Sequence, residues 1–210
     1  MSGLSTLIGV PMLIVSMASP ALLSAQGRPA QLVQSAASSF ATVEVHINQR
    51  QIRGGWYEEN ASLAGPSRLT ISYGQPHARG RAIVGGLIPT DTVWRLGADM
   101  ATTLHTDVDI TLGSLALHRG DYTLFLLHAA GRWDLIVNAE TGQWGTDYDA
   151  AKDVGRVALR VGSMKDNEDA LTIYLVPDAP HPETGYGEPA GVLRIRWGTT
   201  ELSVPWRVGR

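Results

Sequence analysis

DYTLFLLHAAGRWDLIVN, residues 121–138, is the stretch that decides the fold class of this chain. Two runs rich in β-branched, aromatic and leucine residues, 121–128 and 132–138, flank Ala129-Ala130-Gly131, and a short glycine-containing link of this kind closes a β-hairpin. In the first run both sets of alternate side chains are largely apolar. A strand with two apolar faces is covered on both sides, so we expect residues 121–128 to lie centrally in a sheet.

Similar short runs continue in both directions, separated by Gly and Pro about every 8–12 residues, and no long window has the periodicity of an amphipathic helix. They are residues 43–47, 68–73, 102–112, 156–161, 171–176, 191–197 and 201–206. Many short strands at this spacing predict an all-β chain, folded as an antiparallel β-sandwich or jelly-roll-like single domain over residues 43–210.

Turn residues indicate how these strands connect. Gly113-Ser114 fits a two-residue hairpin turn, and we expect a continuous meander from Thr102 to Asn138. Gly198-Thr199-Thr200 predicts a further turn between the last two strands. In RIRW, residues 194–197, the arginines alternate with Ile and Trp, as in a strand that faces water on one side.

The amino-terminal region has the features of an export signal. Residues 1–27 carry no charged side chain, and an apolar run interrupted by Pro11 and Pro20 ends at Ala25, a small residue suited to signal peptidase. The prolines disfavour a membrane-spanning helix. We therefore expect a cleaved signal peptide over 1–25, a flexible lead-in over 26–42, a periplasmic or secreted bacterial protein, and no stable membrane anchor after cleavage.

Composition excludes several functions. The 210 residues carry a net charge of −3, whereas nucleic-acid binders present a basic face, so we expect no nucleic-acid partner. The absence of cysteine excludes disulfides and thiolate chemistry. No phosphate-binding or dinucleotide-binding glycine motif, His-Glu-x-x-His or Gly-x-Ser-x-Gly occurs, so no cofactor is expected and enzymatic activity is undecided.

One polar strand face has metal-ligand chemistry. Strand periodicity over 102–112 aligns His105, Asp107 and Asp109, whose imidazole and carboxylates are ligands for a divalent ion. A solvated strand face with no ligand is the alternative, and it is favoured by the absence of a second histidine at a diagnostic spacing.

Two loops contain candidate ligand-binding residues ahead of that strand. Trp94, Arg95 and Asp99 combine a stacking surface with a guanidinium and a carboxylate, although Arg95 and Asp99 form a structural ion pair in the alternative interpretation. The loop QPHARGR, residues 75–81, contains Arg81 among three basic side chains, which suffice for one anionic group.

A third loop, residues 138–156, places Trp144, Tyr148 and Asp149 close together in sequence, a combination found in sugar- and peptide-binding loops. Alternatively, Trp144 is folded back as a cover on the sandwich, with Asp153 and Arg156 paired.

The chain also resembles the exported bacterial domain-of-unknown-function family 2911, closely over residues 68–161. The segments that carry the resemblance are ISYGQPHARGRAIVGGLIP, VWRLGADMATTL, LHRGDYTLFLL, RWDLIVN and QWGTDYDAAKDVGRV. The matching positions are Tyr73, Pro76, Gly80, Arg81, Trp94, Arg95, Gly97, Ala98, Ala101, Thr102, Gly120, Tyr122, Trp144, Gly145, Tyr148 and Asp149. Leu96, Asp99 and Met100 stand where the family pattern has Thr, Asn and Glu. The resemblance implies a secreted β-sandwich-like domain and implies no activity.

Three hypotheses follow. The first is a binding module for a small ligand, glycan or peptide, with a sugar-like or small anionic ligand held near Arg81, Trp94, Arg95, Asp99 and Trp144. The second is a hydrolase-like or metal-dependent enzyme that uses His105, Asp107 or Asp99. The third is a structural domain of the cell envelope in which the Trp and Arg side chains serve packing alone. The oligomeric state is open in each.

Overall fold

The computed structural model describes residues 37–47, 49–52, 55–58, 67–179 and 189–209. In these residues the chain is β-strand and loop, with one short 3-10 helix, η1 (Ala150–Lys152). No helix in the described part has the length and apolar character needed to cross a membrane. The predicted signal peptide, and the lead-in up to residue 36, lie outside the described residues.

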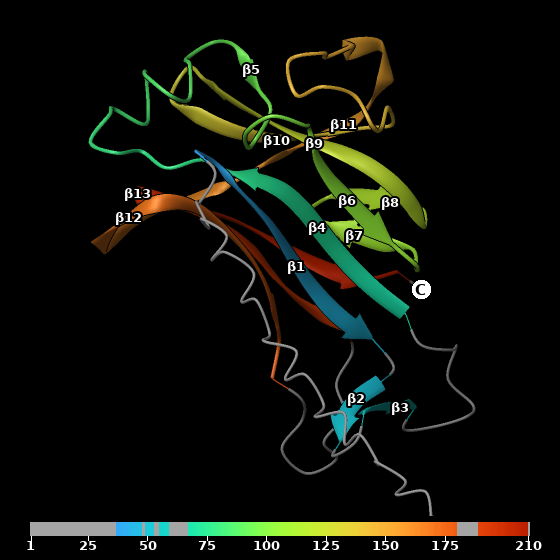
Figure 1. The fold of residues 1–210 in the computed structure, drawn as a ribbon. Helices are drawn as coiled ribbons and strands as arrows, with labels where there is room; N and C mark the ends of the chain where they lie inside the picture. The colour runs from blue at the N-terminus through green and yellow to red at the C-terminus, as the bar shows by residue number, and fades with distance from the viewer. Residues whose placement is uncertain (1–36, 48, 53–54, 59–66, 180–188, 210) are drawn as a thin grey trace, which may run out of the picture. The chain divides into compact units, whose positions relative to one another are not determined.

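The larger sheet has the strand order β1-β4-β6-β9-β10-β11, and β5 pairs with β9 off this path (Figure 1). Its strands are β1 (Ser39–Ile47), β4 (Ser67–Gln75), β5 (Val93–Trp94), β6 (Thr102–Thr106), β9 (Gly120–Ala129), β10 (Arg132–Asn138) and β11 (Asp153–Ala158). All pairings in it are antiparallel.

The smaller sheet has the order β12-β13-β7-β8, also antiparallel. Its strands are β7 (Ile110–Leu112), β8 (Leu115–Leu117), β12 (Arg160–Pro177) and β13 (Ala190–Val208). A separate two-stranded ribbon consists of β2 (Gln49–Ile52) and β3 (Gly55–Glu58). In Figure 1 the long β12–β13 pair crosses behind β1, β4 and β6.

The two sheets pack face to face over one apolar core, which confirms the predicted β-sandwich. Alternate residues of both sheets enter this core, such as Leu69 and Ile71 of β4 and Leu193 and Ile195 of β13. Because the side-chain period of a strand is two, the intervening residues face outward. On β13 these include Arg194 and Arg196, which alternate with the buried Ile195 and Trp197, so the predicted alternation in RIRW is confirmed.

The central strand is β9, as the sequence predicts. Leu124 and Leu126 point into the main core, while Phe125 faces the other way into a second apolar cluster with Ala101 and Ile136. Both faces of β9 are thus covered. The expected hairpin to β10 turns through Ala130 and Gly131, with φ of 50° and 72°.

The expected meander from Thr102 to Asn138 is wrong in its middle. β6 ends at Thr106, which pairs with Gly120 of β9, and residues 107–119 leave for the smaller sheet as the β7–β8 hairpin. The single strand predicted over 102–112 is therefore two strands in different sheets. Its hairpin turn is as predicted, with Gly113 at φ 58°.

Two further boundaries differ from expectation. Gly198 does not end a strand, because β13 continues through it and stays paired with β12 from Gly191 to Ser203. Gly198 has φ 62° and faces Glu168 where the register shifts, so the glycine marks a bulge. Residues 39–42, predicted as flexible, are the start of β1 and pair with β4.

Candidate functional site

The two loops richest in candidate residues are joined by main-chain contacts. The amide of Gly145 donates to the carbonyl of Asp99 at 3.0 Å, and the amide of Ala101 donates to the carbonyl of Gln143 at 3.3 Å. Met100 and Trp144 form a β-bridge between these two bonds. We call residues 95–101 together with 143–145 the clasp. It brings together side chains that lie more than forty positions apart in sequence.

The first half of the clasp is held in an unusual backbone conformation. Leu96 and Asp99 have φ of 51° and 62°, in the left-handed region that non-glycine residues rarely adopt. The loop is anchored because the Thr102 hydroxyl donates to the Leu96 carbonyl at 2.9 Å and the Ala98 amide donates to Gly74 at 3.0 Å. Strained backbone that is tied down this firmly is characteristic of functional loops.

Gly145 sets the spacing between the two halves. A Cβ at this position would meet the side chain of Arg95 and lie 2.7 Å from the carbonyl oxygen of Asp99. No side chain fits there without moving the loop. A glycine is therefore required for the two halves to approach closely enough to bond.

The clasp presents an aromatic and a thioether side chain to solvent. Trp144 is 48% exposed and Met100 is 44% exposed, although the main chain of both is fixed by the bridge. An exposed indole on an ordered backbone offers a flat apolar face at low cost in conformational entropy. The sequence leaves two alternatives for Trp144: a side chain open to a ligand, or a cover folded back on the sandwich. The observed exposure of Trp144 lies between the two.

Polar side chains also belong to the clasp. The carboxylate of Asp99 is exposed, and the half-buried Arg95 donates from Nε to the Gly97 carbonyl at 3.2 Å. Within the described part of the chain Arg95 forms no ion pair, so the alternative of an Arg95–Asp99 salt bridge is not what the structure contains.

Tyr148 and Asp149 support the second loop. The Tyr148 ring packs edge-on against Phe125 at 4.9 Å between centroids, and its hydroxyl donates to Asp153 at 2.7 Å. Arg156 donates to the Tyr148 hydroxyl and pairs with Asp153, both at 3.1 Å, which is the pairing that the sequence offers as an alternative. Burial, followed by the hydrogen bond to Asp153, raises the pKa of Tyr148.

Asp149 caps η1 through the amide of Ala151 at 2.9 Å.

Trp94 and Arg81 take no part in the clasp contacts. Trp94 is buried and lies in the core between the sheets, where it stacks on another indole. Arg81 donates from Nε and Nη2 to the carbonyls of Ala78 and His77, at 3.0 and 2.7 Å, and so belongs to its own loop. Arg95, Asp99 and Trp144 are brought together in the clasp, whereas Tyr148 packs on Phe125 and Asp149 caps η1.

The predicted metal ligands separate into two groups. His105 lies between two carboxylates: Nδ1 is 2.7 Å from Asp121 and Nε2 is 2.9 Å from Asp107. Asp109 instead accepts from the amide of Arg119 at 2.8 Å and contacts His118. Both ring nitrogens of His105 are thus engaged, and the structure arranges no group of three or more His, Asp or Glu around a metal position among the described residues.

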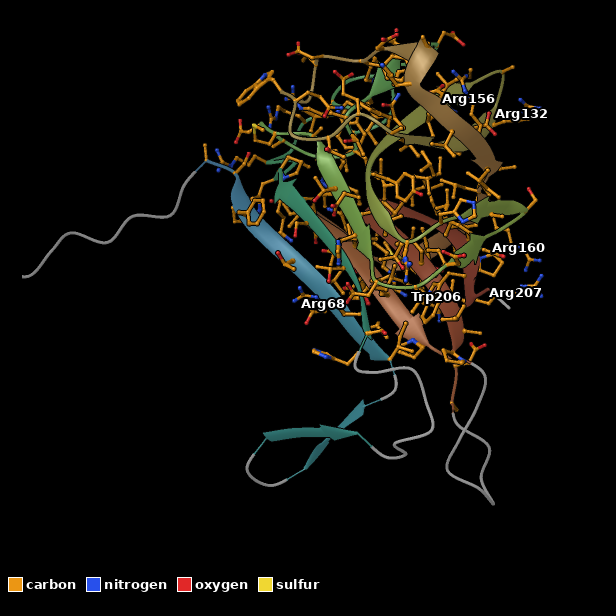
Figure 2. All side chains as sticks on the ribbon, turned by 90° about the vertical axis from the view of Figure 1, so that its right-hand side faces the viewer. Arg68, Arg132, Arg156, Arg160, Trp206 and Arg207 are labelled. Atoms are coloured by element: carbon orange, nitrogen blue, oxygen red, sulfur yellow. The ribbon has the colours of Figure 1, made fainter. Side chains whose placement is uncertain are left out.

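The His105 cluster extends across the open face of the sheet. Arg68 contacts Asp107 at 3.6 Å and Glu44 at 3.8 Å, and Glu44 accepts from Thr70 at 2.9 Å. The hydrogen bonds to Asp121 and then to Asp107 raise the pKa of His105. Arg68 and Arg156 lie well apart in Figure 2, so this network is separate from the Tyr148 cluster.

Sequence reasoning missed three members of these arrangements: Met100, Gln143 and Asp121. Met100 and Gln143 join the two loops through a β-bridge and a main-chain hydrogen bond, which side-chain patterns do not show. Asp121 was detectable in principle, because in an antiparallel sheet it lies directly across from His105.

The fold and the clasp together define an antiparallel β-sandwich protein whose candidate ligand site is built from loops at one sheet. A family model described as a protein of unknown function (DUF2911) matches residues 57–206, and the chain belongs to this family. This confirms the resemblance seen in the sequence. No curated protein and no solved structure matches the chain.

Proposed function

We propose that this protein is a glycan-binding module that acts outside the cytoplasm and that its clasp holds a sugar ring against Trp144. The observation that carries the proposal is the exposed indole fixed between two hydrogen-bonded loops. Apolar faces of sugar rings stack on indoles, and the ring hydroxyls pair with carboxylates and guanidinium groups beside them.

The clasp supplies both kinds of contact. Trp144 and Met100 form the apolar part, and Asp99 and Arg95 supply an acceptor and donors within the same loop pair. A ligand that displaces water from these groups gains hydrogen bonds and need not order the loop. The backbone of the loop is already tied to β4, because the Ala98 amide bonds to Gly74. Preorganisation of this kind favours binding.

Local charge favours a hydroxyl-rich ligand over a small anion. Asp99, Asp147 and Asp149 are exposed on or near the clasp, whereas Arg95 is half-buried. A negatively charged surface repels anions and leaves neutral hydroxyl groups unaffected. A neutral sugar is therefore the ligand class that fits best.

The proposed location rests on the amino-terminal sequence. Residues 1–25 are uncharged and largely apolar and end in the small residue Ala25. A signal peptide with these features directs a protein across the bacterial inner membrane. A periplasmic or secreted protein meets glycans of the cell envelope and of its surroundings.

The test is direct binding. The purified chain is applied to an array of neutral and acidic oligosaccharides, and the strongest hit is titrated while tryptophan emission is recorded. We expect saturable binding with an emission shift. Trp144→Ala should weaken the affinity at least about tenfold, which corresponds to about 1.4 kcal/mol. Trp144→Phe, which keeps a ring, should retain part of it.

Phe40→Ala is the matched control, because Phe40 is 72% exposed and lies on β1, outside the clasp. It should bind as the unaltered protein does. An array without any ligand, or equal losses for the two alanine variants, would remove the glycan-binding proposal.

A further inference from the structure

A groove lies at one end of the smaller sheet, where the β7–β8 hairpin meets the last residues of β13. Its volume is about 650 Å³. The side chains that line it include Asp109, Thr111, Ala116, His118 and Arg207. Small-molecule sites in proteins have volumes of about 300–1,000 Å³, so the groove has room for a ligand without any movement of the chain.

The floor of the groove is a row of three side chains on neighbouring strands. Thr111 of β7 pairs with Arg207 of β13 on one side and with Ala116 of β8 on the other. Paired residues of antiparallel strands point to the same face, with Cβ atoms about 4.5–5.5 Å apart. That face is the outer one, because the alternate residues Ile110 and Leu112 are buried in the core. A guanidinium and a hydroxyl therefore lie side by side in the groove, next to a small methyl group.

A carboxylate is fixed at the end of this row. The carbonyl of Asp109 accepts from the amide of Gly209 at 2.6 Å, and its carboxylate accepts from the amide of Arg119 at 2.8 Å. His118 contributes a second contact, with Nδ1 3.4 Å from the carboxylate. The hydrogen bond from Arg119, followed by that from His118, lowers the pKa of Asp109. The carboxylate is 57% exposed and keeps acceptor positions for a ligand.

The positive charge in the groove has no partner among the described residues. Arg207 is exposed, and its guanidinium forms neither an ion pair nor a hydrogen bond there. Asp109 and Arg207 thus share one groove and do not pair with each other. Two opposite charges that are kept apart in this way are complementary to a ligand that carries both charges.

We propose that the groove binds a short peptide with free termini, with its carboxylate on Arg207 and Thr111 and its ammonium group on Asp109. A guanidinium binds a carboxylate through two parallel hydrogen bonds. A site of this volume suits a ligand of drug-like size, which a peptide of two or three residues has and a single small amino acid does not.

This site is separate from the clasp and does not depend on glycan binding. Arg207 lies well apart from Arg156 in Figure 2, and Arg156 belongs to the Tyr148 cluster that supports the second loop of the clasp. A ligand in the groove therefore leaves the clasp accessible.

The test uses trialanine as the probe at about pH 7, where both of its termini are charged. NMR chemical-shift titration is the measurement, because it records weak as well as tight binding. We expect saturable binding with shifts at Thr111 and Ala116. Acetylation of the amino terminus and amidation of the carboxyl terminus should each weaken binding at least about tenfold, since each removes one charge. Alanine itself should also bind at least about tenfold more weakly, because it cannot span the groove.

Two substitutions assign each end of the peptide to one residue. Arg207→Gln should weaken binding of trialanine about tenfold and leave the weaker binding of its amide unchanged, because the amide has no carboxylate to lose. Asp109→Asn should act in the same way on trialanine and on its acetylated form. Ala116→Leu, which narrows the groove and alters no charge, should weaken binding of all three peptides.

Arg160→Gln is the matched control, because Arg160 is an exposed arginine of β12 that does not line the groove (Figure 2). It should bind trialanine as the unaltered protein does. Equal affinity for the free, acetylated and amidated peptides would overturn the proposal, as would equal losses in Arg160→Gln and Arg207→Gln. So would a failure of trialanine to bind the unaltered protein. These outcomes leave glycan binding by the clasp untouched, since that is measured with other ligands and variants.

Discussion

The indoles of Trp94 and Trp197 stack with their centroids 5.7 Å apart and 18° between their planes. Trp94 belongs to β5 of the larger sheet and Trp197 to β13 of the smaller one, so this contact joins the two layers. Both side chains are almost fully buried. Trp94 therefore joins the two layers of the sandwich, and its buried indole is not available to stack on a ligand.

Trp94→Ala and Trp144→Ala should differ sharply in stability. Removal of the buried indole leaves a cavity between the sheets and should lower the free energy of unfolding by about 3–5 kcal/mol. Removal of the half-exposed indole should change it by about 0.5 kcal/mol or less. Urea denaturation followed by circular dichroism measures both. Similar values for the two variants would contradict the assignment of Trp94 to the core and Trp144 to the surface.

His105 should make stability depend on pH. Its hydrogen bonds to Asp121 and Asp107 raise its pKa in the folded state above the ordinary value of 6.5. Its stabilising contribution is therefore complete below about 6.5 and is lost as the pH rises through the higher folded pKa. His105→Gln should cost more free energy of unfolding at about pH 5.5 than at about pH 8.5.

The carboxylate side of the same pair titrates in the opposite direction. Burial works to raise the pKa of Asp107, but the hydrogen bonds from His105 and from the amide of Arg68, together with the charges of these two residues, outweigh it, and the pKa lies below 3.8. The contribution of Asp107 is thus present above that value and lost as the pH falls through the folded pKa. NMR titration of the histidine ring measures the pKa of His105. A value at or below 6.5 would contradict this account.

Gly145→Ala should damage the clasp while leaving the sandwich folded. The new methyl group would meet the Arg95 side chain and the Asp99 carbonyl, so the two loops must separate. We expect a loss of about 1–3 kcal/mol in stability and weaker glycan binding. Gly142→Asn is the matched control, because Gly142 has φ 80° with open space around it, and Asn tolerates that conformation. Thermal unfolding of both variants decides the question.

Asp99 should respond to substitution according to its backbone. At φ 62°, Asn is as well suited as Asp, so Asp99→Asn should keep the unfolding free energy within about 0.5 kcal/mol. Asp99→Ala should lose about 1–2 kcal/mol, because alanine pays the full cost of the left-handed region. Differential scanning calorimetry distinguishes the two; an Ala variant as stable as the Asn variant would show that the loop relaxes.

The fold class was predictable because strand periodicity and turn chemistry are local. The doubly apolar run 121–128 identified the central strand, and Gly113 and Gly131 identified their turns. The pairing was less predictable. A break after Thr106 sends the chain to the other sheet, and nothing in the alternation of TTLHTDVDITL marks that change. Gly198 shows the same limit, since a glycine suits a bulge as well as a turn.

The candidate site was predictable by residue type and only partly by role. Arg95, Asp99 and Trp144 do lie together, yet they are positioned by main-chain bonds between two loops that side-chain patterns do not encode. Trp94 was misleading, because an indole in a polar motif suits a stacking surface and a buried core equally well. The predicted alignment of Asp107 and Asp109 with His105 required one unbroken strand, but the strand ends before Asp107.

The route of the chain between the layers has a consequence for folding. Among the described strands it passes from one sheet to the other after β6, after β8 and after β11. Neither sheet is formed by one continuous segment of the chain. The strands of one sheet are separated in sequence by strands of the other, so neither sheet can pair all of its strands while the other is absent. Partial unfolding of a single layer is thereby discouraged, and the sandwich should melt in one cooperative, all-or-none step.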